Sequence, residues 1–189
     1  MLTIKRITRK LGSTDGAEIA EATLVLPLVF MLLLGIVWFG RAFNIYSTIQ
    51  QAAQQGAIAA ARATCATCGN TSALDGTVTS CPVTGSPGSV TYAIESVMCA
   101  SNLDPTQIPV NSNPPNPVSC ATPPTIPCTT TDQITVCRQA LLNPPASTQP
   151  PQCGTIVGFQ YPFKFNFPGT SLNMQQIILS AQAQSRMEN

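Results

Sequence analysis

The sequence has no histidine, and only 9% of its residues are charged, well under the roughly 25% of an ordinary soluble domain. Without histidine there is no His-based acid–base catalysis, no Ser–His or Cys–His nucleophile pair and no His-ligated metal site. From residue 65 onward the five acids and three bases are scattered, so they predict neither a metal cage nor a nucleic-acid-binding face. We expect no enzymatic activity, no cofactor and no nucleic-acid partner.

Charge is also missing from residues 22–40, an apolar stretch bounded by Glu21 and Arg41. A helix of this length rises about 28 Å, close to the hydrocarbon thickness of a bilayer. A cleaved secretory signal is the alternative, but the stretch exceeds the roughly 7–15 apolar residues of such signals. The nearest cleavage-like site, at residues 40–42, also carries the charge of Arg41. We therefore predict a single-pass protein of the cytoplasmic (inner) membrane with residues 22–40 as its span.

Apart from Arg41 itself, the basic residues near this span lie on one side of it. Four precede it, at positions 5, 6, 9 and 10, and none lies within the twenty residues after Arg41. By the positive-inside bias, the N-terminus is cytoplasmic and the chain after Arg41 is exported, to the periplasm or the outside.

All eight cysteines lie on the exported side, between residues 65 and 153. An even number of cysteines in an oxidising compartment is typical of structural disulfides. We expect four bridges, without assigning their pairing, among Cys65, Cys68, Cys81, Cys99, Cys120, Cys128, Cys137 and Cys153.

The pair Cys65 and Cys68 has the C-x-x-C spacing, which is also found in thiol oxidoreductases and zinc sites. A redox pair belongs to a βαβ context with an adjoining helix start, whereas this motif follows the predicted end of a helix. A four-cysteine zinc site requires a second C-x-x-C, and the sequence contains none. A structural disulfide is the favoured interpretation, and an exported thiol oxidoreductase is the enzymatic alternative.

A glycine and a glutamate five positions later, Gly16 and Glu21, lie just before the span. A carboxylate beside an apolar span costs a few kcal/mol unless it is paired. A cut after Gly16 makes Ala17 the new N-terminus and Glu21 the fifth residue of the mature chain. The α-ammonium and this carboxylate then pair within one chain or between chains, which sets the axial register of an assembly. The simpler alternative is that Glu21 only marks the membrane interface.

Residues 16–27, 35–43 and 52–57 together resemble the TadE-like pseudopilins, which are minor pilin-like subunits of the tight-adherence (Tad) type IV pilus. Residues 179–188 are similar to the closing strand of that family, with its Arg-x-Glu ending. Family members usually place an aromatic residue directly after the fifth-position acid, whereas Ala22 follows it here.

The resemblance implies a cytoplasmic leader, residues 1–16, that a prepilin peptidase removes after Gly16, with Glu21 as the fifth-position acid. It implies that the partners are other pilin and pseudopilin subunits, the Tad inner-membrane assembly platform and the lipid bilayer. The implied function is assembly of a Tad-type pilus for surface adhesion, with the chain in the membrane and in the pilus. The alternative is an unprocessed, signal-anchored domain that binds a ligand or a surface outside the cytoplasm.

A helical pattern continues beyond the span. Small or apolar residues recur at spacings of four and three, and they are Ala42, Tyr46, Ile49, Ala53, Gly56 and Ala60. We predict one long helix over residues 17–64, with its transmembrane part at 22–40 and a kink or loosening at Pro27. Residues 65–189 then form an exported domain rich in cysteine and proline.

The exported domain is predicted to be α+β, a small disulfide-rich antiparallel sheet with one short helix. Apolar positions after Ser89 predict the helix, with Pro87 in its first turn and Asp104-Pro105 as its stop. The eight prolines between residues 104 and 127 predict an irregular surface loop with too few apolar residues to join a core.

Three strands are predicted, over residues 133–137, 158–167 and 179–187. In the second, the aromatic residues at alternate positions from 159 to 167 favour the core face of a sheet over an adhesive surface. Pro162 lies within this run, which predicts an edge position or a bulge, because proline cannot donate a ladder hydrogen bond.

Overall fold

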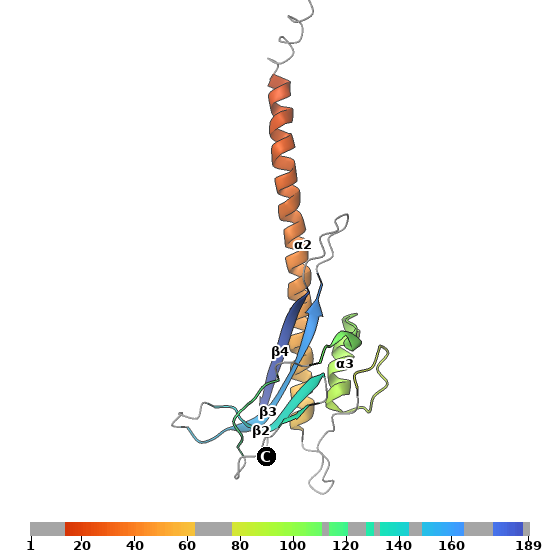
Figure 1. Cartoon of the computed structure of the whole chain (residues 1–189), viewed down its shortest axis with the longest axis vertical. Helices are drawn as coiled ribbons and strands as arrows, with labels where there is room; N and C mark the ends of the chain where they lie inside the picture. Colours follow the sequence, from red (N-terminus) through yellow and green to blue (C-terminus); the bar gives the residue numbers. More distant parts are fainter. Residues whose placement is uncertain are drawn as a thin grey trace, which may run out of the picture. The chain divides into compact units, whose positions relative to one another are not determined.

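The computed structural model describes residues 14–62, 77–110, 114–120, 128–130, 133–143, 149–164 and 176–186, with side chains from residue 19 onward. Its elements, shown in Figure 1, are α2 (Thr14–Ala61), α3 (Val90–Ala100), the 3-10 turn η1 (Pro105–Gln107), β1 (Cys128–Thr130), β2 (Ile134–Leu141), β3 (Cys153–Phe163) and β4 (Ile177–Arg186). Backbone contacts divide the chain into two compact units, Met1–Ala42 and Phe43–Asn189. The predicted fold class is confirmed: a long apolar helix, a short helix and a four-stranded antiparallel sheet with three disulfides form an α+β protein.

Helix α2 is 48 residues long and includes Pro27 in its interior. It begins three residues before the predicted start, and it ends at Ala61 rather than at residue 64. In the second unit its buried face is the predicted stripe of mostly small residues, in which Ile49 and Ala53 are fully buried. Tyr46 departs from that stripe, because its side chain is 43% exposed. The glutamines at positions 51, 54 and 55 are exposed, as expected of the opposite face.

The sheet has the order β1-β2-β3-β4 with every neighbouring pair antiparallel. Strand β3 pairs with β4 without interruption from Gly154 opposite Arg186 to Phe163 opposite Ile177. The α2 residues of the second unit share one core cluster with α3, β2, β3 and β4, and Figure 1 shows this part of the helix along the sheet. The aromatic side chains at positions 159, 161 and 163 are buried, which confirms the core face predicted for them. Phe165 and Phe167 lie outside the described residues.

Pro162 lies in a strand that has neighbours on both sides, so the predicted edge position is wrong for β3 as a whole. The pairing explains how the proline is tolerated. Strand β2 pairs with β3 only as far as Phe159, whereas β4 continues to Phe163. Among the described residues Pro162 therefore has a strand partner on the β4 side alone, and its missing N–H removes no bond to β2.

Residues 114–120, which we name the covering segment, lie along β2 and over the outer face of β3. The backbone of this segment joins the end of β2, since the Leu141 N–H bonds to Val118 O at 2.8 Å and the Cys120 N–H to Gln139 O at 2.7 Å. A Cβ added at Gly158 of β3 would lie 3.2 Å from Pro115 Cδ. At Gly158 the covering segment therefore buries the outer face of β3.

One expectation for the proline-rich region, residues 104–127, is wrong. Ile108, just after η1, is 2% exposed and belongs to the main core cluster, although the region was expected to contribute nothing to a core. Its neighbour Pro105 is buried as well. One apolar side chain held by a short 3-10 turn is enough to anchor a segment whose composition is otherwise polar.

Helix α3 begins at a Ser89 cap, after the Pro87 that was predicted to lie in its first turn, and it ends earlier than expected. The Ser89 hydroxyl accepts a bond from the Tyr92 N–H at 3.1 Å, while Pro87 lies in the preceding turn rather than in the helix. The helix ends at Ala100; Asn102, just after the cap residue Ser101, adopts a φ of 55°, and the Leu103 N–H bonds back to Met98 O at 2.9 Å. This is a Schellman ending with asparagine in the position usual for glycine, so Asp104-Pro105 starts η1 and does not stop α3.

Candidate functional site: the apolar helix and the disulfide-bonded domain

The first unit presents apolar side chains to its surroundings on α2. Leu24, Met31 and Phe39 are 72%, 77% and 79% exposed, and other large apolar residues between them are similarly open. Its most apolar 18-residue window has a mean hydropathy of 2.5, and none of that window is buried. A core helix of a soluble protein would bury such residues. Within the described part of the chain, α2 is the helix that is long and apolar enough to cross a membrane.

A polar side chain within this segment is satisfied inside the helix. The Thr23 hydroxyl donates to Ile19 O, one turn earlier, at 2.7 Å. An unbonded hydroxyl is costly in hydrocarbon, whereas a bond to the preceding turn removes that cost. The residue is therefore compatible with a bilayer environment.

Gly16 and Ala17 lie in the first turn of α2, and their side-chain surroundings are outside what the structure describes. Glu21 follows on the next turn with its side chain exposed. The structure thus places the three residues close together at the start of one helix. The processing and assembly roles given to them remain predictions.

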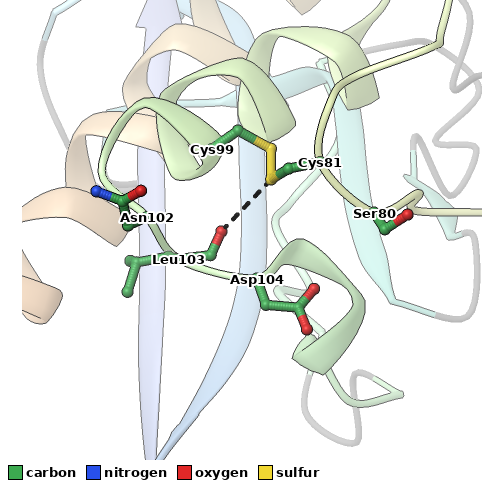
Figure 2. Close-up of a pocket in the computed structure, with 6 residues that line it drawn as sticks. All are labelled: Ser80, Cys81, Cys99, Asn102, Leu103 and Asp104. Carbon is green, nitrogen blue, oxygen red and sulfur yellow. Dashed lines mark hydrogen bonds between the residues drawn. A yellow bond between two sulfur atoms is a disulfide. The ribbon is translucent and has the colours of Figure 1, made fainter.

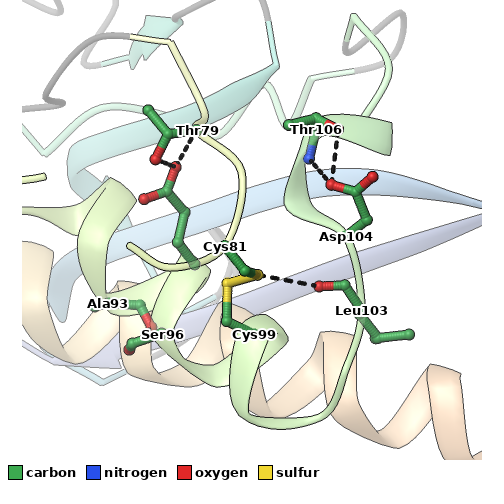
Figure 3. Close-up of a disulfide and its surroundings, with 9 residues drawn as sticks. Thr79, Cys81, Ala93, Ser96, Cys99, Leu103, Asp104 and Thr106 are labelled. Carbon is green, nitrogen blue, oxygen red and sulfur yellow. Dashed lines mark hydrogen bonds between the residues drawn. A yellow bond between two sulfur atoms is a disulfide. The ribbon is translucent and has the colours of Figure 1, made fainter. Parts of the chain in front are cut away.

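Three disulfides fasten the domain of the second unit. Cys81–Cys99 ties the segment before α3 to that helix, as Figure 3 shows, with a Cα–Cα distance of 5.8 Å. Cys120–Cys153 fastens the covering segment to the first residue of β3, and Cys128–Cys137 joins β1 and β2 at directly paired positions. Every cysteine within the described residues is bridged, while Cys65 and Cys68 lie outside them. Disulfides of this number are typical of a compartment outside the cytoplasm.

A carboxylate of α3 is buried against the segment that precedes this helix. Glu95 of α3 is 1% exposed, and its Oε1 accepts bonds from the Thr79 N–H and, at 3.2 Å, from the Thr79 hydroxyl. The neighbouring Val78 N–H donates to Gln133 Oε1 at 3.3 Å. The Nε2 of the same Gln133 side chain donates to Ile108 O at 2.9 Å. Two buried or half-buried side chains therefore hold residues 78 and 79 against α3 and the sheet.

An open depression of about 370 Å³ lies beside the Cys81–Cys99 bridge. Figure 2 shows the residues that line it, which are Ser80, Cys81, Cys99, Asn102, Leu103 and Asp104. The Asp104 carboxylate is already engaged, because it accepts bonds from the Thr106 N–H at 3.0 Å and the Thr106 hydroxyl at 2.7 Å. These bonds hold the pKa of Asp104 below its ordinary value. The carboxylate therefore caps η1 and is not poised as an acid or a base.

The phenol of Tyr161 on β3 is coupled to the same aspartate. Burial raises the pKa of Tyr161, the charge of Asp104 raises it further, and a hydrogen bond with the Asp104 backbone opposes both effects. The neutral phenol is thus the form that suits this site. In the described residues no three or more Asp, Glu or Cys side chains converge on a point where a metal could bind.

Sequence reasoning did not anticipate Glu95, Thr79 or the covering segment. The bonding partner that identifies Glu95 as a buried residue lies sixteen residues away along the chain. The sole available signal was the position of Glu95 beside Ile94 on the apolar side of α3, which is an atypical place for a charge.

Comparison with known proteins gives a match to one protein family. The family model described as TadE-like protein matches residues 16–57, which begin at Gly16 and run through the apolar part of α2 into the buried stripe. No curated protein and no solved structure matches the chain. The apolar helix and the disulfide-bonded domain indicate a membrane-anchored protein with its domain outside the cytoplasm. Residues 16–57, about a fifth of the chain, are therefore TadE-like.

Proposed function

We propose that this chain is a minor pilin or pseudopilin that a prepilin peptidase cleaves after Gly16, and that it takes part in assembling a Tad-type pilus for surface adhesion. The single observation that carries the proposal is the family match to residues 16–57, which coincides with the apolar helix. The exported domain is then the part that the filament presents or uses to begin assembly. The chain acts through binding and not through catalysis.

The proposal includes an organisation of the chain. In it, residues 1–16 are a basic cytoplasmic leader, residues 17–64 carry the helix with its span at 22–40, and residues 65–189 form the exported domain. In the second unit, small side chains on α2 let the helix approach the sheet closely, since Ala52 and Ala53 are both fully buried. The large apolar residues of the first unit stay exposed for lipid or for neighbouring helices.

The proposed partners follow from the same parts of the chain. The leader is the substrate of the prepilin peptidase, and the apolar helix meets the bilayer and the helices of other pilin and pseudopilin subunits. The Tad inner-membrane assembly platform binds the processed chain. Between subunits, the new α-ammonium of Ala17 and the carboxylate of Glu21 neutralise each other, which fixes the axial register.

Intact mass measurement of the protein from membranes of cells with and without the prepilin peptidase tests the proposal. We expect a peptidase-dependent loss equal to residues 1–16, with Ala17 as the new N-terminus. The variant Gly16→Leu should keep its full mass in both cells. The matched variant Gly12→Leu, also in the leader, should be cleaved like the wild type.

The other outcomes are equally informative. A full-length mass in both cells would overturn the proposed processing and would favour an unprocessed, signal-anchored binding domain. A cut near Ala42, independent of the peptidase, would show that residues 22–40 are a cleaved signal and that the domain is released.

A further inference from the structure

The end of the apolar segment carries an aromatic ring and a cation in contact. The Arg41 guanidinium carbon lies 5.9 Å from the centroid of the Trp38 ring, three residues earlier on α2. Such a distance is that of a cation–π contact, in which the ring face attracts the positive group. Both residues belong to the first unit, where Phe39 beside them is 79% exposed.

The charge of Arg41 is isolated along the helix. The nearest acid along α2 is Glu21, which lies about 30 Å away along the helix axis because each residue rises about 1.5 Å. Only Lys and Arg side chains with long stems keep their charge in water or headgroups while their carbons lie along hydrocarbon. Arg41 is the first charged residue after the span, so it stands where hydrocarbon gives way to phosphate.

The two side chains have complementary roles toward a phosphate. A guanidinium offers a planar fork of N–H donors that matches two phosphate oxygens at once, which an ammonium does not. An indole prefers the headgroup level of a bilayer, where its body is in an apolar environment and its N–H in a polar one. A ring at that level would hold the guanidinium beside it, and a lipid phosphate there would supply the negative charge that α2 lacks near Arg41.

We propose that Trp38 and Arg41 form a binding site for the phosphate of a phospholipid headgroup, in the leaflet that faces the exported domain. The bound headgroup fixes the depth of α2 in the bilayer. The inference rests on the membrane anchoring within the proposed function and needs neither processing nor pilus assembly. Its ligand is a lipid phosphate and not a free phosphate in solution.

Trp38 is the only tryptophan of the chain, so its fluorescence reports on this one position. The full-length protein is reconstituted in vesicles of phosphatidylcholine and phosphatidylglycerol that carry bromine at a shallow or a deep acyl position. We expect the shallow bromines to quench the wild type more strongly. In Arg41→Gln, we expect Trp38 to move deeper by about 5 Å, one helical turn, with emission shifted to the blue.

Two variants serve as controls. Arg41→Lys keeps the charge without the planar fork, so its quenching should lie between the wild type and Arg41→Gln. Arg62→Gln removes the next basic residue, beyond the end of α2, and should leave the emission unchanged. Native mass spectrometry should find one fewer retained phosphatidylglycerol on Arg41→Gln than on the wild type or on Arg62→Gln.

Three results would overturn the inference. Quenching that is unchanged in Arg41→Gln would show that Arg41 does not set the depth, while leaving the proposed function intact. An emission shift on adding soluble glycerophosphate to the wild type would identify a free phosphate as the ligand. Trp38 that no lipid bromine quenches would show that residues 22–40 do not span a bilayer, and this outcome alone would also contradict the proposed function.

Discussion

Among single residues, Glu95 imposes the strictest requirement on the domain. Its carboxylate is 1% exposed, so other protein groups must donate the hydrogen bonds that water would otherwise supply. Thr79 supplies two of them, one from its backbone and one from its hydroxyl. The pair joins the segment before α3 to the helix itself, next to the Cys81–Cys99 bridge (Figure 3). A covalent and a polar fastening thus act on neighbouring residues of one segment.

Replacing Glu95 tests this fastening. We expect Glu95→Ala to lower the free energy of unfolding by about 1–3 kcal/mol, because it leaves the part-buried Thr79 N–H without its acceptor. Glu95→Gln keeps an acceptor oxygen and should cost less. Thr79→Val, which removes only the hydroxyl, is the control that separates the two bonds. Urea unfolding of the full chain in detergent measures the differences, and equal stability of all variants would show that the bonds contribute nothing.

Tyr161 makes the domain sensitive to alkaline pH. Its raised pKa means that the folded protein favours the neutral phenol, chiefly because burial disfavours the charged form. The stabilisation is complete below about pH 10, where an unfolded tyrosine titrates, and it is lost as the pH rises through the folded-state pKa. The chain has three tyrosines, so a tyrosinate absorbance titration should show one of them titrating last.

The variant Tyr161→Phe should remove that last step, and Asp104→Asn should move it to lower pH by removing the nearby negative charge. Tyr92→Phe serves as the control and should leave the step in place. A single titration of all three phenols in the wild type would contradict the coupling of Tyr161 to its surroundings.

At the scale of secondary structure, α2 packs closely against the sheet because its side chains there are small. A Cβ added at Gly56 would lie 2.8 Å from Ile94 Cγ1, 2.9 Å from Ile94 Cδ1 and 3.4 Å from Val157 Cγ1. Gly56 therefore lets α2 approach both α3 and β3. This packing requirement explains a glycine in the middle of a helix, where it would otherwise cost about 1 kcal/mol relative to alanine.

Gly56→Ala tests that approach. Overpacking of a filled core costs about 1–3 kcal/mol, which we expect to exceed the gain in helix propensity, so the variant should unfold at lower urea concentration. Ile94→Val should cost less in the Gly56→Ala background than alone, because it removes Cδ1, one of the two Ile94 atoms that clash. Gly40→Ala, whose added Cβ would meet nothing within 4 Å, should not lower the urea concentration at which the chain unfolds. Additive effects at positions 56 and 94 would contradict direct contact.

Elements in which apolar or small residues recur at a regular spacing could be predicted from the sequence. The buried stripe of α2 and the alternating burial of β4 both follow from local spacing, and the structure confirms them. The length of β2 could not be predicted, because an irregularity between Cys137 and Ala140 with Gln139 at φ 54° interrupts its alternation. The disulfide pairing, the cover over β3 and the burial of Glu95 depend on segments distant along the chain, so no local pattern reveals them.

On the scale of the whole molecule, the start of α2 carries the prediction that matters most for assembly. Glu21 is exposed on the helix at the edge of the apolar segment, so its charge is available to another chain. A carboxylate at that depth is costly in a bundle of helices unless a positive group pairs with it. The α-ammonium released by cleavage after Gly16 is the positive group that the proposed function supplies.

We therefore expect Glu21→Ala to reach the membrane in normal amounts but to disappear from sheared surface filaments. Glu18→Ala, which removes a carboxylate one turn earlier, should enter filaments like the wild type. Comparing the membrane and filament fractions by immunoblotting measures both. Normal entry of Glu21→Ala into filaments would show that the pairing does not govern assembly.

The shared core of α2 and β4 also dictates when the domain can fold. Ile49 and Ala53 lie near the beginning of the chain, yet they share one hydrophobic cluster with Ala181 and Ala183 near its end. During synthesis the helix must therefore wait, unpacked, for about 120 residues to emerge before its partner strand exists. A waiting surface made mostly of alanine and glycine exposes less apolar area than one of leucine would, and so attracts fewer wrong partners. The small side chains that allow close packing in the finished domain thus also protect the nascent chain from aggregation.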